Sequence, residues 1–66
     1  MDNRICSERA AIKMTQADLA EKIGVTRDTI SSWERGGDVP GSALKKMTEV
    51  FNCSMDWLAG ISETRK

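Results

Sequence analysis

The chain has 66 residues, with ten basic and ten acidic side chains and a formal net charge of zero at pH 7. This length allows one domain with a modest core, and the charge balance excludes a generally basic protein, although local basic patches are compatible with it. There is no histidine, and Cys6 and Cys53 are the only cysteines, so no metal site is expected. The longest apolar run is three residues, too short for a membrane span. We expect no cofactor and two reduced thiols in a cytoplasmic protein.

The spacing of apolar residues predicts an all-α fold with five helices, because no run alternates with a period of two and only one proline interrupts the chain. The first helix is expected over residues 3–13. Ile5, Arg9 and Ile12 are separated there by four and three positions. They are therefore expected to share the inward face of that helix.

Threonines mark the starts of the next two helices. Thr15 is a suitable N-cap, and Asp18 three residues later completes a short capping box. Gly24 follows the last apolar position of this second helix, where a left-handed residue commonly ends a helix. Thr26 is expected to cap a third helix over residues 27–35. The core side chains expected from these two helices are Leu19, Ala20, Ile23, Ile30 and Trp33.

The last third of the chain predicts two more helices. One is expected over residues 42–51, with Asn52 as a left-handed stop. Ser54 is expected to cap a short final helix over residues 55–59, and the polar residues 62–66 are expected to fray. The core side chains expected here are Leu44, Met47, Val50, Phe51, Met55 and Leu58.

Residues 16–35 have the spacing of a helix-turn-helix, in which two helices cross at a steep angle through a short turn. Ala20 is small where the third helix is expected to pass close over the second. Gly24 permits the turn conformation, and Val25 is expected to fill the corner. We therefore interpret residues 1–61 as a single helix-turn-helix domain; the alternative is a generic helical hairpin in a small bundle.

Three segments carry a resemblance to a known family: MTQADLAEKIGV, ISSWERG and SMDWLAG. They resemble the helix-turn-helix domains of the Cro and CI repressor type, also called the XRE family. SMDWLAG is similar to the closing segment of many phage and prophage repressors. The resemblance covers residues 4–60. It implies a compact five-helix lambda-repressor-like domain and sequence-specific binding to a double-stranded DNA operator.

The resemblance also implies which side chains would contact DNA. The third helix of such a domain lies in the major groove with its N-terminal residues at the base edges. Arginine can donate two hydrogen bonds to guanine, and aspartate can accept one from cytosine; the alternative for either is a solvated first turn. The positions expected to read bases are Thr26, Arg27, Asp28 and Ser32, and those expected to contact the DNA backbone are Gln16, Ser31, Arg35 and Ser42.

Three other side chains are given roles of a different kind. By resemblance, Arg9 in the first helix is expected to form a partly buried ion pair with Glu34, which follows Trp33, and so to lock the first helix to the third. Trp57 leaves two alternatives open. It could complete the core, or it could lie in a dimer contact, where tryptophan is favoured.

The loop after the third helix departs from the family pattern. Many relatives carry several basic residues there, whereas residues 36–41 contain Asp38 and no base. Fewer neutralised phosphates mean weaker binding and a shallower dependence on salt. A homodimer, at least on DNA, would double the contacts and read two half-sites about 34 Å apart.

The sequence thus predicts a cytoplasmic transcriptional regulator of the repressor type. The alternative is a protein-interaction or antitoxin-like adaptor on the same scaffold, which the zero net charge and Asp38 favour. An enzyme has almost no support, because the chain offers no histidine, no pairing of nucleophile and base, and no phosphate loop. Neither a small-molecule ligand nor a membrane contact is expected.

Overall fold

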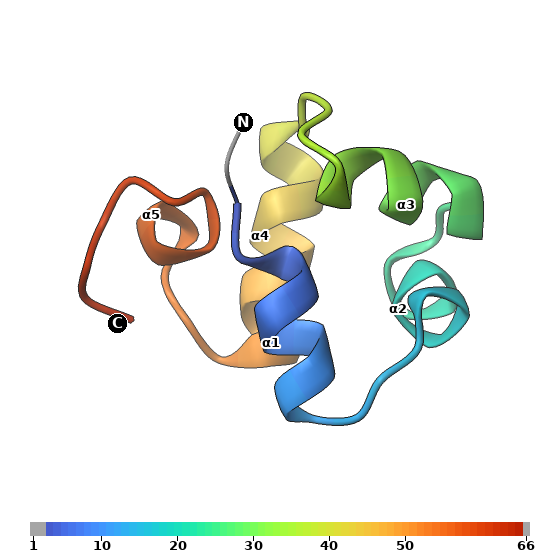
Figure 1. The fold of residues 1–66 in the computed structure, drawn as a ribbon, viewed down its shortest axis with the longest axis horizontal. Helices are drawn as coiled ribbons and strands as arrows, with labels where there is room; N and C mark the ends of the chain where they lie inside the picture. Colours follow the sequence, from blue (N-terminus) through green and yellow to red (C-terminus); the bar gives the residue numbers. More distant parts are fainter. Residues whose placement is uncertain (1–2, 66) are drawn as a thin grey trace.

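A computed structural model describes residues 3–65, which contain only α-helices as regular structure. This confirms the prediction of a five-helix, all-α fold. In Figure 1, α2 and α3 lie on one side of α1 and α4, and α5 lies on the other side with the C-terminal segment. None of the helices within these residues is long and apolar enough to cross a membrane. The helices are α1 (Ile5–Ala11), α2 (Gln16–Ile23), α3 (Arg27–Glu34), α4 (Gly41–Phe51) and α5 (Met55–Leu58).

Local hydrogen bonds set most helix boundaries as predicted. The Thr15 hydroxyl accepts from the Asp18 backbone N–H at 3.0 Å, and the Asp18 carboxylate accepts from the Thr15 N–H at 3.2 Å, which forms the predicted capping box. Ser54 caps α5 in the same manner, accepting from a backbone N–H at 3.1 Å. Gly24 and Asn52 both end their helices in the left-handed conformation, with φ of 81° and 54°. These signals act within a few residues, so they are legible in the sequence.

The first helix is shorter than the predicted 3–13. It begins at Ile5, whose backbone N–H donates to the Asn3 side chain at 3.1 Å. It ends before Ile12, and Lys13 then adopts a left-handed φ of 56°. Ile12 is consequently 51% exposed, so its predicted place on the inward face of α1 is wrong. The helix stops before the turn that would carry this side chain inward.

The core draws side chains from all five helices. The largest that are fully buried are Ile5, Leu19, Ile30, Met47 and Leu58. Val25 and Val50 pack against this cluster and are partly buried. Met55, predicted as a core residue, is 40% exposed, because it is the first residue of the short α5 and only Leu58 of that helix is buried. The remaining core side chains are Ala20, Ile23, Trp33, Ala43, Leu44, Phe51 and Ala59.

Within the C-terminal tail that was predicted to fray, Arg65 makes contacts with the rest of the chain; Lys66 lies outside the described residues. The Arg65 guanidinium donates to the Glu8 carboxylate at 2.7 Å and to the backbone carbonyls of Phe51 and Asn52 at 2.6 and 3.1 Å. The Arg65 carbonyl in turn accepts from the Ser54 N–H at 2.8 Å. These contacts join the tail to α1 and to the end of α4.

Trp57 is half-buried, and its side chain is occupied by contacts within the chain. Its indole N–H donates to the Glu8 carboxylate at 3.0 Å. The Arg4 guanidinium lies over the ring, 3.7 Å from its centroid, a cation–π arrangement. Trp57 therefore contributes to the junction of α1 and α5, although it is not among the buried core residues. The alternative of a dimer contact stays a prediction.

Candidate nucleic-acid interface

α2 and α3 meet in a tight turn at Gly24. The backbone N–H groups of Gly24 and Val25 both donate to the Ala20 carbonyl, at 2.8 and 2.9 Å. Ala20 is 4% exposed, as expected for a position over which another helix passes. Ile30 and Trp33 are buried on the inner side of α3, so the packing of α3 leaves its polar residues on the outside.

The outer face of α3 carries the predicted base-reading side chains. Thr26, Arg27, Asp28 and Ser32 are all exposed. The Thr26 hydroxyl is held by the helix cap, because it accepts from the Thr29 N–H at 3.3 Å and lies 2.8 Å from the Thr29 hydroxyl. The ion pairs formed among residues 3–65 involve neither Arg27 nor Asp28. Both charged groups are therefore free to bind an external partner.

Three of the four predicted backbone contacts come from different helix ends. Gln16 is the first residue of α2 and is half-buried, while Arg35 is exposed just after α3. Ser42 is exposed in the first turn of α4, whose N-cap Pro40 provides no side-chain hydrogen bond. The N–H groups of such a first turn have no partner within the helix and attract anions. Ser31, within α3, is half-buried like Gln16.

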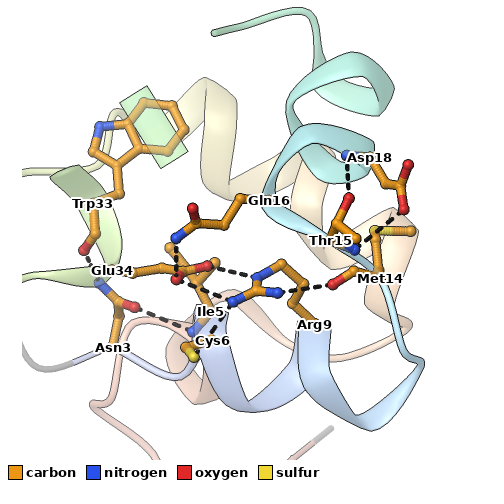
Figure 2. Close-up of polar contacts among 10 residues, drawn as sticks. All are labelled: Asn3, Ile5, Cys6, Arg9, Met14, Thr15, Gln16, Asp18, Trp33 and Glu34. Carbon is orange, nitrogen blue, oxygen red and sulfur yellow. Dashed lines mark hydrogen bonds and ion pairs between the residues drawn. The ribbon is translucent and has the colours of Figure 1, made fainter. Parts of the chain in front are cut away.

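The predicted ion pair between Arg9 and Glu34 is present and nearly enclosed (Figure 2). Arg9 Nε lies 2.8 Å and Arg9 Nη2 3.3 Å from the two oxygens of the Glu34 carboxylate. The side chains are 17% and 8% exposed. Arg9 Nη1 also donates to the Met14 carbonyl at 2.8 Å, and Gln16 Nε2 donates to Glu34 Oε1 at 2.9 Å. One carboxylate thus joins α1, α2 and α3.

These contacts shift the pKa values of two glutamates below their usual range. Burial by itself raises the pKa of Glu34, but hydrogen bonds from Arg9 and Gln16 and the charge of Arg9 outweigh it. The hydrogen bond from Arg65 is the main cause of the lowered pKa of Glu8; burial opposes it, and the Trp57 indole assists it. Both carboxyls are therefore held in the ionised form in the folded protein.

The free energy of unfolding is expected to fall with acidification. The two lowered pKa values mean that the unfolded state binds protons first, from near its glutamate pKa of about 4.3. The stability from these pairs is complete above that pH and is lost as the pH falls through the folded pKa values. Urea unfolding between pH 7 and pH 3 checks this expectation. E8Q and E34Q should each flatten the profile, and a profile as steep as the parent's in both variants would contradict it.

Sequence reasoning missed Glu8, a charged residue of α1 that is only 8% exposed. It lies three positions after Ile5 and so shares its face, which was the one available signal. Arg4 was missed as well, although its guanidinium donates to the Trp57 and Ser62 carbonyls at 2.6 and 2.8 Å. The Asn3 side chain donates to the Trp33 carbonyl at 2.8 Å. Glu8, Arg4 and Asn3 attach α1 to other parts of the chain, and none of them belongs to the polar outer face of α3.

Comparison with known proteins places this geometry in a family. Residues 7–58 match the model of a family described as helix-turn-helix. The chain belongs to this helix-turn-helix family, of the Cro and CI type that its motifs resemble. This confirms the resemblance and the lambda-repressor-like fold drawn from the sequence.

The helix-turn-helix relatives include named repressors and regulators. The chain is 37% identical over 59 residues to "Repressor protein C2" of Salmonella phage P22, covering 88% of this chain and 27% of the relative. It is 36% identical over 56 residues to "HTH-type transcriptional regulator DicA" of Escherichia coli (strain K12), covering 83% and 42%. It thus spans less than half the length of either relative.

A solved structure has the same fold. It is titled "Crystal structure of the P22 c2 repressor protein in complex with synthetic operator 9T in the presence of Tl+". It superposes with a TM-score of 0.82 at 33% identity, covering 89% of this chain and 91% of that one. The helix-turn-helix chain described here therefore has the architecture of a domain crystallised with a DNA operator.

Proposed function

We propose that this chain is a sequence-specific, double-stranded-DNA-binding transcriptional regulator of the repressor type. The observation that carries the proposal is the outer face of α3, where exposed polar side chains, including an unpaired arginine, lie on a helix fixed by a helix-turn-helix. The named repressors among its relatives and the operator complex of a structural neighbour support it. α3 would lie in the major groove. No reaction is assigned, because helix-turn-helix regulators are not enzymes.

Base reading is assigned to the first turn of α3. Arg27 would donate two hydrogen bonds to guanine, and Asp28 would accept from cytosine. Ser32, one turn further along the same helix, would donate or accept. The Thr26 hydroxyl is engaged in the helix cap. We therefore propose that Thr26 contacts the DNA through its methyl group.

The DNA backbone contacts are assigned to Gln16, Ser31, Arg35 and Ser42. The starts of α2 and α4 support this assignment, since each offers backbone N–H groups to a phosphate. Asp38 is exposed in the loop between Arg35 and the start of α4, and its negative charge repels phosphate. We therefore expect modest affinity for one copy and propose a homodimer on DNA, which would bind two half-sites about 34 Å apart. The site of action would be the cytoplasm.

Arg27→Ala is expected to weaken binding to the preferred operator by about 1–3 kcal/mol and to relax selection at one base pair. The physical reason is loss of the two-donor fork that recognises guanine. Selection from randomised DNA duplexes at low salt, with parent and variant in parallel, measures both effects. Arg27→Lys is the matched control, since it keeps the charge without the fork. Unchanged base selection in both variants would remove Arg27 from the readout.

The second candidate function is an adaptor or antitoxin-like protein that uses the helix-turn-helix to bind a protein. The zero net charge and the acidic loop residue Asp38 favour it. The salt dependence of DNA binding separates the two candidates. A regulator that neutralises several phosphates loses affinity with a log–log slope of several units, whereas an adaptor shows almost none.

A further inference from the structure

The turn that ends α3 brings Gly37 against Ser32. The Gly37 N–H donates to the Ser32 carbonyl at 3.0 Å, and the Gly36 N–H donates to the Trp33 carbonyl at 3.1 Å. Gly36 adopts a left-handed φ of 103°. These bonds and this conformation form a Schellman motif, in which the residue after the left-handed one lies over the residue five positions before it. In this chain the covered residue is Ser32, one of the proposed base-reading residues.

The contact with Ser32 leaves no room for a side chain at position 37. A Cβ on Gly37 would lie 2.9 Å from the Ser32 carbonyl oxygen and 3.1 Å from Ser32 Oγ. Real Cβ atoms essentially never approach another group to less than 3.0 Å. The closer of the two atoms belongs to the backbone, so the loop itself would have to move. The φ of Gly37 is not positive, so the need for glycine is steric and comes from Ser32.

The Ser32 hydroxyl is open to an external partner. Ser32 is exposed, and within residues 3–65 no hydrogen bond holds its hydroxyl. Such a hydroxyl can donate to one base edge or accept from another. A Cβ at position 37 would be 3.1 Å from this oxygen, so a side chain there would crowd the hydroxyl and change the direction in which it points.

We propose that Gly37 is a positioning residue for base reading: because it has no side chain, the loop after α3 closes on Ser32 and leaves the Ser32 hydroxyl free to meet a base edge. This inference rests on the proposed function, and it adds a residue of the loop to those that determine specificity. Gly37 acts through Ser32 and contacts no base itself.

A thermodynamic cycle tests the proposal with the duplex that the parent selects. G37A, S32A and the double variant are measured on that duplex and on duplexes with single base-pair changes. The ratio of the two affinities is the readout, because phosphate contacts carry no sequence information and cancel in it. We expect S32A and G37A each to lower this ratio about fivefold at the same base pair, the low end for one base pair. The double variant should lower it no further, because Gly37 acts through Ser32.

G41A provides the matched control. It adds the same methyl group where the loop enters α4, and a Cβ on Gly41 would meet nothing within 4 Å, so its base selection should equal the parent's. Parent-like selection in G37A or in S32A would overturn the inference alone, and so would effects of the two changes that multiply. A parent that selects no duplex would overturn the proposed function and the inference with it.

A second measurement needs no variant and covers the case in which G37A does not fold. The bond from the Gly37 N–H to the Ser32 carbonyl should make this amide exchange with solvent more slowly than the amide of the exposed Asp38. The Gly37 α protons should also show a nuclear Overhauser effect to the Ser32 β protons, both in the free protein and on the selected duplex. Equal exchange of the two amides, or loss of the Overhauser effect on the duplex, would overturn the proposal.

Discussion

Replacing Arg9 with alanine is expected to lower the free energy of unfolding by about 3 kcal/mol, as when one partner of a buried ion pair is removed. The change leaves the Glu34 carboxylate, 8% exposed, without its counterion, and the Met14 carbonyl without its donor. A domain of 66 residues has about 3–10 kcal/mol of stability in total. The variant should therefore lose between about a third of its stability and nearly all of it.

Urea unfolding of three variants separates the buried charge from the lost contact. Arg35→Ala removes an arginine that is exposed and should change stability by less than about 0.5 kcal/mol. Replacing Arg9 and Glu34 together with Met and Leu should recover much of the loss, because no charge is then left unpaired. If Arg9→Ala unfolds at the same urea concentration as Arg35→Ala, the pair contributes no more than a surface contact.

Leu58→Ala is expected to cost about 2–5 kcal/mol, the range for removing a large side chain from a packed core. Leu58 is fully buried and is the one buried residue of α5. That helix is four residues long, so its own backbone hydrogen bonds cannot maintain it. The truncation should loosen α5 and with it the attachment of Trp57 to Glu8.

Met55→Ala is the control on the same helix. Met55 is 40% exposed, so its truncation should change stability by less than about 0.5 kcal/mol. Thermal unfolding followed by circular dichroism compares the two variants directly. Similar melting temperatures for Leu58→Ala and Met55→Ala would mean that α5 contributes little to the stability of the domain.

The sparse charge of the proposed interface has a consequence for affinity. Arg27 and Arg35 are exposed near the two ends of α3, but Asp28 and Asp38 lie on or next to the same surface. Few phosphates are then neutralised by one copy, and each accounts for roughly one unit of the salt slope. Hydrogen bonds from helix N-termini, which add no net charge, would carry a larger share of the binding.

The sequence by itself determined the helix starts and stops. Thr15, Thr26 and Ser54 were readable as caps, and Gly24 as a left-handed stop, because each acts on atoms within five residues of itself. The apolar spacing also predicted most of the core, since the period of a helix fixes which side chains share a face. The exceptions, Ile12 and Met55, lie where a helix ends or begins, and there the periodic pattern no longer decides which side faces the core.

The tertiary structure alone decided the partners of the polar side chains. Gln16 lies 18 positions from Glu34, and Glu8 lies 57 positions from Arg65, so no local spacing could pair them. A glutamine or glutamate is equally compatible with solvent and with a buried partner until the fold brings an arginine beside it. The proposed base contact of Arg27 stays a prediction for the same reason, because it is determined by the DNA that this side chain would bind.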